Sequence, residues 1–294
     1  MRRKKNNSWT IYLLLLACLI NPILSTNASG QNIRKSWLKV MKACSGSEIT
    51  GKNVLFFGPS NTIGLGSIWR KTGKKSYNPR FEMSELFNDS IQKQVIVYGT
   101  KTNQCVSSKN SSWDDSADAP IISGIFGMTG INVDFRKARR TTITVDSIAL
   151  DVIKELDFED ALHKLREKDP QNPYLLDILN NNRLVVTKAY RLTGLKVTLD
   201  YDPKQLDSLK NKYPTGASIS IGGNKGIKLS FDYKSSRELT IALPQDVYIA
   251  GELSQISQNG TINLSDKNAF PDIHLLQVKV DPDATVGTVE NIKN

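Results

Sequence analysis

Few side chains in this chain are placed to act as catalysts. Only two of its 294 residues are histidines. His163 falls in a helical pattern beside Lys164 and Arg166, where a solvated surface histidine is expected, and His274 falls in a predicted edge strand. A Ser/His/Asp triad needs a nucleophile in a recognisable context such as a nucleophile elbow, and the sequence shows none. We therefore expect a protein that is not an enzyme and that uses no cofactor.

Two further patterns are too incomplete to predict a ligand. Gly64-Leu65-Gly66 lacks the third glycine of a dinucleotide fingerprint and the Lys-Ser/Thr of a phosphate loop, so it predicts a turn. Asp114-Asp115 and Asp281-Pro282-Asp283 could help to bind calcium, but neither supplies the number of oxygen ligands that such a site needs. We predict no metal site.

The cysteines suggest an oxidising compartment. Cys44 and Cys105 have no metal-ligand spacing, so they predict one disulfide, with two separate thiols as the alternative. Such a bond would close a loop of about 60 residues and contribute roughly 4 kcal/mol. The third cysteine, Cys18, ends Leu15-Leu16-Ala17-Cys18, which resembles a bacterial lipobox and would make Cys18 a site of acylation.

The first 28 residues are typical of an export signal. A positive segment, Arg2 to Lys5, precedes an apolar stretch that runs from Ile11 to Leu24 with an interruption at Asn21-Pro22. Small or polar residues then lead to a predicted cleavage site near Ala28. The apolar stretch is shorter than the about 20 residues of a membrane span, which favours cleavage over an uncleaved anchor. We expect a secreted or periplasmic protein, tethered to the membrane if Cys18 is acylated.

The composition is that of a folded protein with a modest positive charge. Hydrophobic residues make up 39% and charged residues 23% of the chain, as in globular domains. The formal net charge is +10, and removal of residues 1–28, which hold four basic and no acidic residues, leaves +6. Such a charge favours anionic lipid, glycan or polyanion surfaces, or simply maintains solubility.

The densest basic cluster after the signal is Arg136-Lys137-Ala138-Arg139-Arg140, and it follows a glycine-interrupted apolar segment, Ile121 to Gly130. Each basic residue near an anionic membrane contributes about 1 kcal/mol. The predicted contacts with a membrane or polyanion are therefore Arg136, Lys137, Arg139 and Arg140, with a solvated strand end as the alternative. Nucleic-acid binding is not expected, because Phe135 is the only aromatic residue near the cluster.

Most of the remaining sequence alternates between apolar and polar residues, as strands do. A hairpin is predicted around Gly222 to Gly226, and a slip in the alternation at Thr193-Gly194 predicts a bulge or bend. The helix predicted over Asn32 to Ala43 could dock on the core or lie on a membrane as a basic amphipathic segment. Other strands are predicted over 54–57, 67–71, 94–99, 131–135, 141–146, 184–201, 227–233, 239–253 and 273–280, and other helices over 148–156, 157–165, 174–179 and 203–212.

These elements predict an α+β fold, a twisted and mainly antiparallel sheet with helices packed on one side. The helices are expected from about Ser147 to Leu179. The predicted organisation is a signal peptide (1–28), an N-terminal segment (29–52), a single α+β domain (53–256) and a polar C-terminal segment with a possible edge strand (257–294).

The order of elements from about Ile121 to Leu253 resembles the pore-forming domain of gasdermins. In both, a glycine-interrupted β stretch leads through a strand into a helix, here through Val145-Asp146. A further segment with a helical pattern follows, here around Asn172-Pro173-Tyr174-Leu175-Leu176. A long strand pair and then a strand, a proline and another strand complete the pattern, here over Leu239 to Leu253. The resemblance implies amphipathic hairpins that extend on oligomerisation to line a membrane pore. The Gly58 to Trp69 stretch also looks like uncharacterised secreted bacterial proteins.

The leading functional expectation is a non-enzymatic secreted or periplasmic protein that acts at an anionic membrane or envelope surface, with a gasdermin-like sheet. One alternative is a soluble extracytoplasmic module that binds a glycan or small ligand by stacking on Trp69 or Trp113. A second alternative, an envelope hydrolase, would need a cluster of titratable residues in one cleft.

Overall fold

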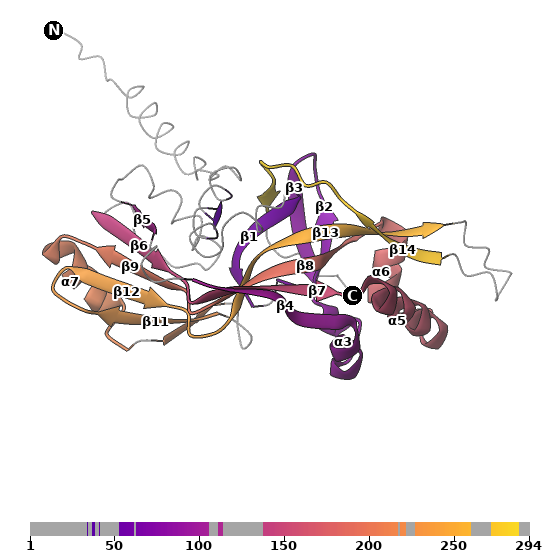
Figure 1. Cartoon of the computed structure of the whole chain (residues 1–294), viewed down its shortest axis with the longest axis horizontal. Coiled ribbons are helices and arrows are strands. Elements are labelled where there is room, and N and C mark those ends of the chain that lie inside the picture. The colour runs from indigo at the N-terminus through magenta and orange to yellow at the C-terminus, as the bar shows by residue number, and fades with distance from the viewer. Residues whose placement is uncertain are drawn as a thin grey trace, which may run out of the picture.

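Two mainly antiparallel sheets form the frame of the molecule, and strands of one sheet lead along the chain into strands of the other (Figure 1). The computed structural model describes residues 34, 37, 38, 41, 53–61, 63–105, 111–113, 138–216, 218–221, 227–259 and 272–287. The signal segment and the greater part of the 106–137 stretch thus lie outside the described residues.

Sheet A has nine strands in the described part of the chain. One path through it runs β1–β13–β8–β2–β3–β15, while β14 pairs with β13, and β4 and β7 continue the sheet beside β8. The strand β15 pairs with β3 in parallel, and the other pairings among these strands are antiparallel. The strand bounds are β1 Val54–Ser60, β2 Ile68–Lys71, β3 Ser76–Phe81, β4 Ile96–Gln104, β7 Ser147–Ile153, β8 Leu184–Thr193, β13 Val247–Asn259, β14 Asp272–Gln277 and β15 Thr285–Val286.

Sheet B has six strands in the described residues, in the order β10–β11–β12–β9–β6–β5, all antiparallel. The hairpin predicted around 222–226 is confirmed by the pairing of β10 with β11. The bounds are β5 Ser111–Trp113, β6 Arg140–Thr144, β9 Lys196–Asp200, β10 Ser218–Ile221, β11 Ile227–Tyr233 and β12 Glu238–Ala242.

Three passages of the chain between the two sheets lie wholly within the described residues, and we call their region the waist and define it as residues 145–146, 194–195 and 243–246. There β6 leads into β7, β8 into β9, and β12 into β13. Gly194 has a φ of 70°, and a Cβ at this position would lie 1.9 Å from Asp146 Oδ2. Glycine is required because other residues pay a steric penalty in this conformation and would also clash. The bend predicted at Thr193-Gly194 is therefore confirmed.

Sheet B buries one face of strictly alternating residues. Val197 and Leu199 of β9 and Leu239 and Ile241 of β12 are fully buried, and the residues between them face outward. Burying each such side chain contributes about 1.5–3 kcal/mol. Packed on this face are Leu206 of helix α7 (Pro203–Lys212) and, from the predicted 32–43 helix, Trp37 and Met41. For these two residues the docked alternative holds, because they are 0% and 1% exposed.

Three helices cover one face of sheet A (Figure 1). They are α3 (Asp89–Val95), α5 (Glu155–Lys168) and α6 (Pro173–Asn181), and a 3-10 turn, η2 (Met83–Glu85), precedes them. Phe158, Leu162 and Ile178 pack with Val185 and Ile256 of the sheet. Asparagines cap two of the helices: Asn88 accepts from Ile91 N at 3.1 Å, and Asn172 accepts from the first two backbone N–H groups of α6 that follow its proline.

The α+β class with helices packed on one side is confirmed, with two corrections. The single predicted sheet is divided into two at the waist. Residues 147–153, predicted as the start of a helix, form the strand β7, whose buried pattern takes residues from both faces. The strand β7 lies between β4 and β8, and both its faces are covered. Its apolar residues therefore do not follow the alternation of a half-buried strand, and their spacing resembles that of a helix. The boundary predicted at residue 256 falls inside β13, which runs to Asn259.

Candidate functional site

The predicted basic cluster joins the fold at one end of sheet B. Arg140 pairs with Asp200, and Asp200 pairs with Glu238, so β6 begins, β9 ends and β12 begins at the same end. The helix α7 starts there after Asp202, and β11 ends there before the turn at 234–237. We call this end the sheet B tip and define it by residues 139–140, 200–204 and 233–238. It lies away from sheet A and its helices (Figure 1).

The chain between β5 and β6 connects two paired strands at this tip. Trp113 pairs with Thr141, and Ser111 pairs with Ile143, so residues 114–139 are the connection of one hairpin. In the sequence, that connection contains Ile121 to Gly130 and the beginning of the basic cluster, and of these only residues 138–139 belong to the described residues. The described part of the cluster, Arg139 and Arg140, lies at the same end of sheet B as Lys204 of α7 and the 234–237 turn.

The cations at the tip are exposed, and acidic residues lie among them: the cations are Arg139, Arg140, Lys204, Lys234 and Arg237, and the acidic residues are Asp200, Asp202 and Glu238. Arg139 Nη2 lies 2.9 Å from Asp202 Oδ2, with side chains that are 55% and 43% exposed. Such a surface pair contributes at most about 1 kcal/mol and leaves the guanidinium accessible to another anion. Lys234 pairs with Asp232, and this hydrogen bond raises the pKa of Lys234, which stays charged. Arg140 is exposed, whereas Arg136 and Lys137 lie outside the described residues.

The second predicted binding group, Trp69, is not placed to bind a ligand. Its side chain is 0% exposed, its Nε1 donates to Ser67 Oγ at 2.8 Å, and its ring lies 5.7 Å from the ring of Phe57. The short strand β2 lies between β3 and β8, so both faces of the sheet around it are covered and the ring packs in the core. The prediction that Trp69 stacks on a ligand is wrong for this structure. The backbone of Trp113 lies in β5, and the structure does not describe its side chain.

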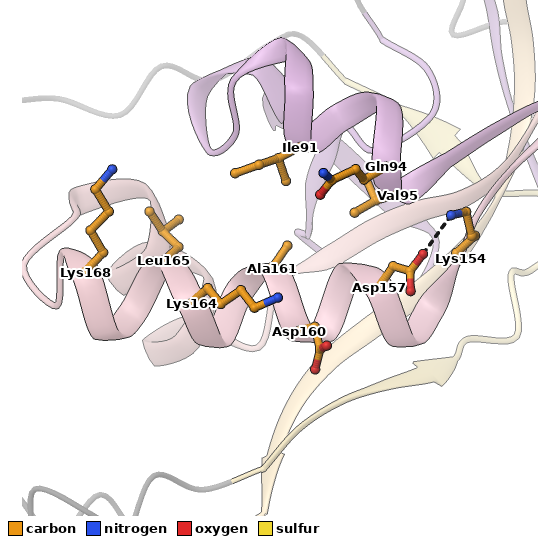
Figure 2. A pocket seen from close by; sticks show the side chains of 10 residues that line it. All are labelled: Ile91, Gln94, Val95, Lys154, Asp157, Asp160, Ala161, Lys164, Leu165 and Lys168. Atoms are coloured by element: carbon orange, nitrogen blue, oxygen red, sulfur yellow. Dashed lines mark hydrogen bonds and ion pairs between the residues drawn. The ribbon is translucent and has the colours of Figure 1, made fainter.

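A hollow that the sequence reasoning missed lies between α3 and α5 (Figure 2). It has a volume of about 380 Å³. Apolar residues of both helices form its floor, and lysines and aspartates line its rim. We call it the α3–α5 groove; its lining residues are Ile91, Gln94, Val95, Lys154, Asp157, Asp160, Ala161, Lys164, Leu165 and Lys168.

A buried carboxylate beside the waist links four strands. Asp151 on β7 is 0% exposed, and its Oδ1 accepts from Gly99 N at 2.7 Å and from Arg191 Nη2 at 3.2 Å. Its Oδ2 accepts from Arg191 Nε at 2.7 Å and from the Tyr248 hydroxyl at 2.8 Å. Arg191 also pairs with Asp246, at the waist. Burial, followed by the charge of Asp151, raises the pKa of Tyr248, so the hydroxyl keeps its proton and remains a donor. This arrangement fixes strand positions and exposes no reactive group.

Neither histidine is part of a catalytic arrangement in the described residues. His163 Nε2 accepts from Ile273 N at 3.3 Å, and Glu159 Oε1, one turn earlier on α5, accepts from Leu275 N at 2.8 Å. These two side chains satisfy backbone N–H groups along the free edge of β14. The expectation of a solvated surface histidine is therefore wrong for His163, because it holds an edge strand. His274 is half-buried on β14.

The cysteine predictions stay predictions. Cys105 is partly buried against the core at the end of β4, and Cys44 and Cys18 lie outside the described residues. Within the described residues no group of three or more His, Cys, Asp or Glu side chains is placed to hold a metal ion. Among the helices that the structure describes, none has the length and apolarity to cross a membrane.

Comparison with known proteins finds similarity among solved structures alone. No protein-family model matches the chain, and no curated protein matches it. Among solved structures, the chain is similar to a bacterial gasdermin from Bradyrhizobium tropiciagri, with a TM-score of 0.46 and 11% identity over 86% of this chain and 95% of that chain. The resemblance expected from the order of elements is thus confirmed as a weak similarity.

Proposed function

We propose that the protein is exported, is not an enzyme, and acts at an anionic membrane or cell-envelope surface through the sheet B tip. The observation that supports this proposal is that the two strands flanking residues 114–139, β5 and β6, pair at one end of an antiparallel sheet, and that the sequence between them holds the apolar segment Ile121 to Gly130 and most of the basic cluster. The exposed cations Lys204, Lys234 and Arg237 lie at the same end.

Basic and apolar residues at one end of a molecule are what a lipid surface selects. Cations hold the protein at anionic headgroups, at about 1 kcal/mol each, and neighbouring apolar residues then gain free energy by leaving water. The pair between Arg139 and Asp202 does not prevent this contact, because both side chains are about half exposed and their attraction is screened.

The finer proposal is a gasdermin-like use of the sheet, in which hairpins of sheet B extend into the membrane when several copies assemble. It is supported by the alternation of these strands: in β6, β9 and β12 every second residue is buried and the others face outward. A hairpin of this pattern presents one apolar face to lipid and one polar face to water. Release of a trapped dye from vesicles tests this step separately from binding.

The direct test is vesicle flotation with the purified full-length chain. We expect binding to vesicles of phosphatidylglycerol and phosphatidylcholine, weaker binding in high salt, and little binding to phosphatidylcholine alone. Replacing Arg139 and Arg140 by alanine removes about 2 kcal/mol of headgroup attraction, equivalent to roughly a thirtyfold loss of affinity. The matched control, Lys74→Ala with Lys93→Ala, removes two exposed charges from sheet A and α3 and should bind as the parent does. Absence of both binding and leakage on anionic vesicles would contradict the membrane proposal.

Export and the Cys44–Cys105 disulfide are tested together by the intact mass of the protein recovered from outside the cytoplasm. Loss of residues 1–28 supports cleavage near Ala28, whereas a lipid adduct on a chain that begins at Cys18 supports tethering. A mass two hydrogens below that of the reduced chain supports the disulfide. A full-length reduced chain found in the cytoplasm would contradict both proposals.

A further inference from the structure

The α3–α5 groove is built by two helices whose facing stripes are regular. On α5, Asp157, Ala161, Lys164 and Lys168 follow one another at spacings of four, three and four residues and so share one side of the helix. On α3, Ile91 and Val95 share the side that faces α5. Figure 2 shows Ile91 and Val95 pointing from α3 toward α5.

The floor of the groove is apolar and partly open. Val95 and Ala161 are buried at its base, while Ile91 and Leu165 are only half-buried where the groove opens. Its volume of about 380 Å³ lies within the range of about 300–1,000 Å³ that small-molecule sites occupy. The floor therefore offers an apolar surface that a hydrocarbon chain could cover.

The charges around the groove are divided between its two ends. At one end, Lys154 Nζ lies 2.7 Å from Asp157 Oδ2, and the two charges offset each other. Lys168 stands at the other end, where Figure 2 shows it pointing from α5 toward α3. Asp160 points away from α3 in the same view, so its carboxylate is not directed into the hollow. Lys168 thus makes this end of the groove basic, while Figure 2 shows the Lys164 side chain, one turn earlier on α5, running along the helix toward Asp160.

We infer that the α3–α5 groove binds an amphiphilic anion. Its acyl chain covers the apolar floor between Ile91 and Leu165, and its carboxylate or phosphate contacts Lys164 and Lys168. Lysine binds such groups as a mobile point charge, which suits a headgroup that is held at the rim of a groove. The inference does not depend on the proposed function, because the groove belongs to the helical layer of sheet A and the sheet B tip lies elsewhere (Figure 1).

The test is isothermal titration of the purified full-length chain with dodecanoate below its micelle concentration. We expect saturable binding to the parent, at least a tenfold weaker affinity for Lys164→Ala with Lys168→Ala, and no comparable binding of dodecyltrimethylammonium, which has the same chain and the opposite charge. The control is again Lys74→Ala with Lys93→Ala. Lys93 is two residues from Ile91 and so projects from the far side of α3, and this control should change the affinity less than twofold.

A vesicle arm identifies the source of the anion. Loss of dodecanoate binding alone in the Lys164/Lys168 variant supports a free fatty acid as the occupant. Loss of binding to phosphatidylglycerol vesicles as well supports a membrane lipid. The inference is overturned if the parent does not bind dodecanoate, or if the variant binds it as tightly as the parent does. Either result leaves the Arg139/Arg140 experiment unaffected, so the two proposals fail separately.

Discussion

Replacement of Asp151 by alanine should destabilise the protein more than removal of any exposed charge. The carboxylate accepts hydrogen bonds from Gly99 N, from two nitrogens of Arg191 and from the Tyr248 hydroxyl, at 2.7 to 3.2 Å. Its removal leaves these donors facing a small cavity. Breaking a buried ion pair from one side costs about 3–5 kcal/mol. Because Arg191 is 23% exposed and keeps Asp246 as a partner, we expect a loss near the lower limit, about 3 kcal/mol.

The loss is measured by urea unfolding and by thermal melting, followed by circular dichroism. For a domain of 150–250 residues each kcal/mol corresponds to about 2–4 °C, so the melting temperature should fall by about 6–12 °C. The variant Asp151→Asn should be nearly as unstable, because either orientation of its amide turns the NH₂ group toward an N–H of Arg191. The control Asp207→Ala removes an exposed carboxylate from α7 and should stay within about 0.5 kcal/mol of the parent. A loss below about 1 kcal/mol for Asp151→Ala would refute the view that this network holds β4, β7, β8 and β13 together.

Three further predictions follow from the same structure. Burial, with a smaller contribution from the charge of Glu252, raises the pKa of Tyr190 to about 12. The contribution of Tyr190 to stability is therefore complete below the unfolded pKa near 10 and is lost as the pH rises from 10 to 12. Between pH 10 and pH 11, urea titrations should show the free energy of unfolding of Tyr190→Phe falling by about 1.0 kcal/mol less than that of the parent, and equal losses would contradict this. Gly194→Ala should be less stable than Gly216→Ala in thermal melts. Both positions have a positive φ, which costs an alanine about 1–2 kcal/mol, but only at Gly194 does the new Cβ meet another group. Equal destabilisation of the two variants would count against the clash. Glu159→Ala frees a backbone N–H on the edge of β14, and light scattering should then show self-association of the protein that increases with its concentration. A variant that stays monomeric at all concentrations would show that this edge is protected in another way.

Local patterns predicted the elements whose two faces have different surroundings. The strands of sheet B have one buried and one outward face, so their alternation is visible in the sequence, and α7 was predicted with its observed bounds because Pro203 begins it and Lys212 ends it. The bend at Thr193-Gly194 was predictable for the same reason. Apolar and polar residues alternate on both sides of it, so the position where the alternation shifts by one residue can be located in the sequence.

Burial on both faces misled the prediction at β7, although the buried strands β1 and β2 were predicted as strands. The spacing of Ile148 and Val152 imitates one side of a helix, although Ile148 packs under sheet B and Ile153 packs under the helices of sheet A. The burial of Asp151 could not be expected either, because an aspartate inside a strand is normally placed at the surface and its partner Arg191 lies 40 residues away.

The candidate sites also differ in how far the sequence could predict them. Arg139 and Arg140 belong to a basic cluster that is continuous along the chain, so the sequence displays it; both are exposed, and their contact with a membrane stays a prediction. The α3–α5 groove was missed because its two walls lie some 60 residues apart in the chain. Trp69 was misassigned because an aromatic residue in a short strand gives no sign of whether its ring faces solvent or the core.

The bend at the waist restricts how the length of these strands can change. Before the bend, Tyr190 and Leu192, with even numbers, point into the core beneath sheet B, and after it Leu195, Val197 and Leu199, with odd numbers, point into the same core. The neighbouring connection behaves alike, with Ile143 and Val145 on one side of the bend and Ile148 on the other. These two crossings therefore each reverse the parity of the inward-facing residues once, whereas across the third crossing Leu243 and Val247 keep the same parity. Because side chains alternate with a period of two, a one-residue insertion or deletion at one of these two crossings would turn the apolar face of the strand that follows to solvent, whereas a change of two residues would preserve it. Among related chains, lengths at these crossings should accordingly vary in steps of two.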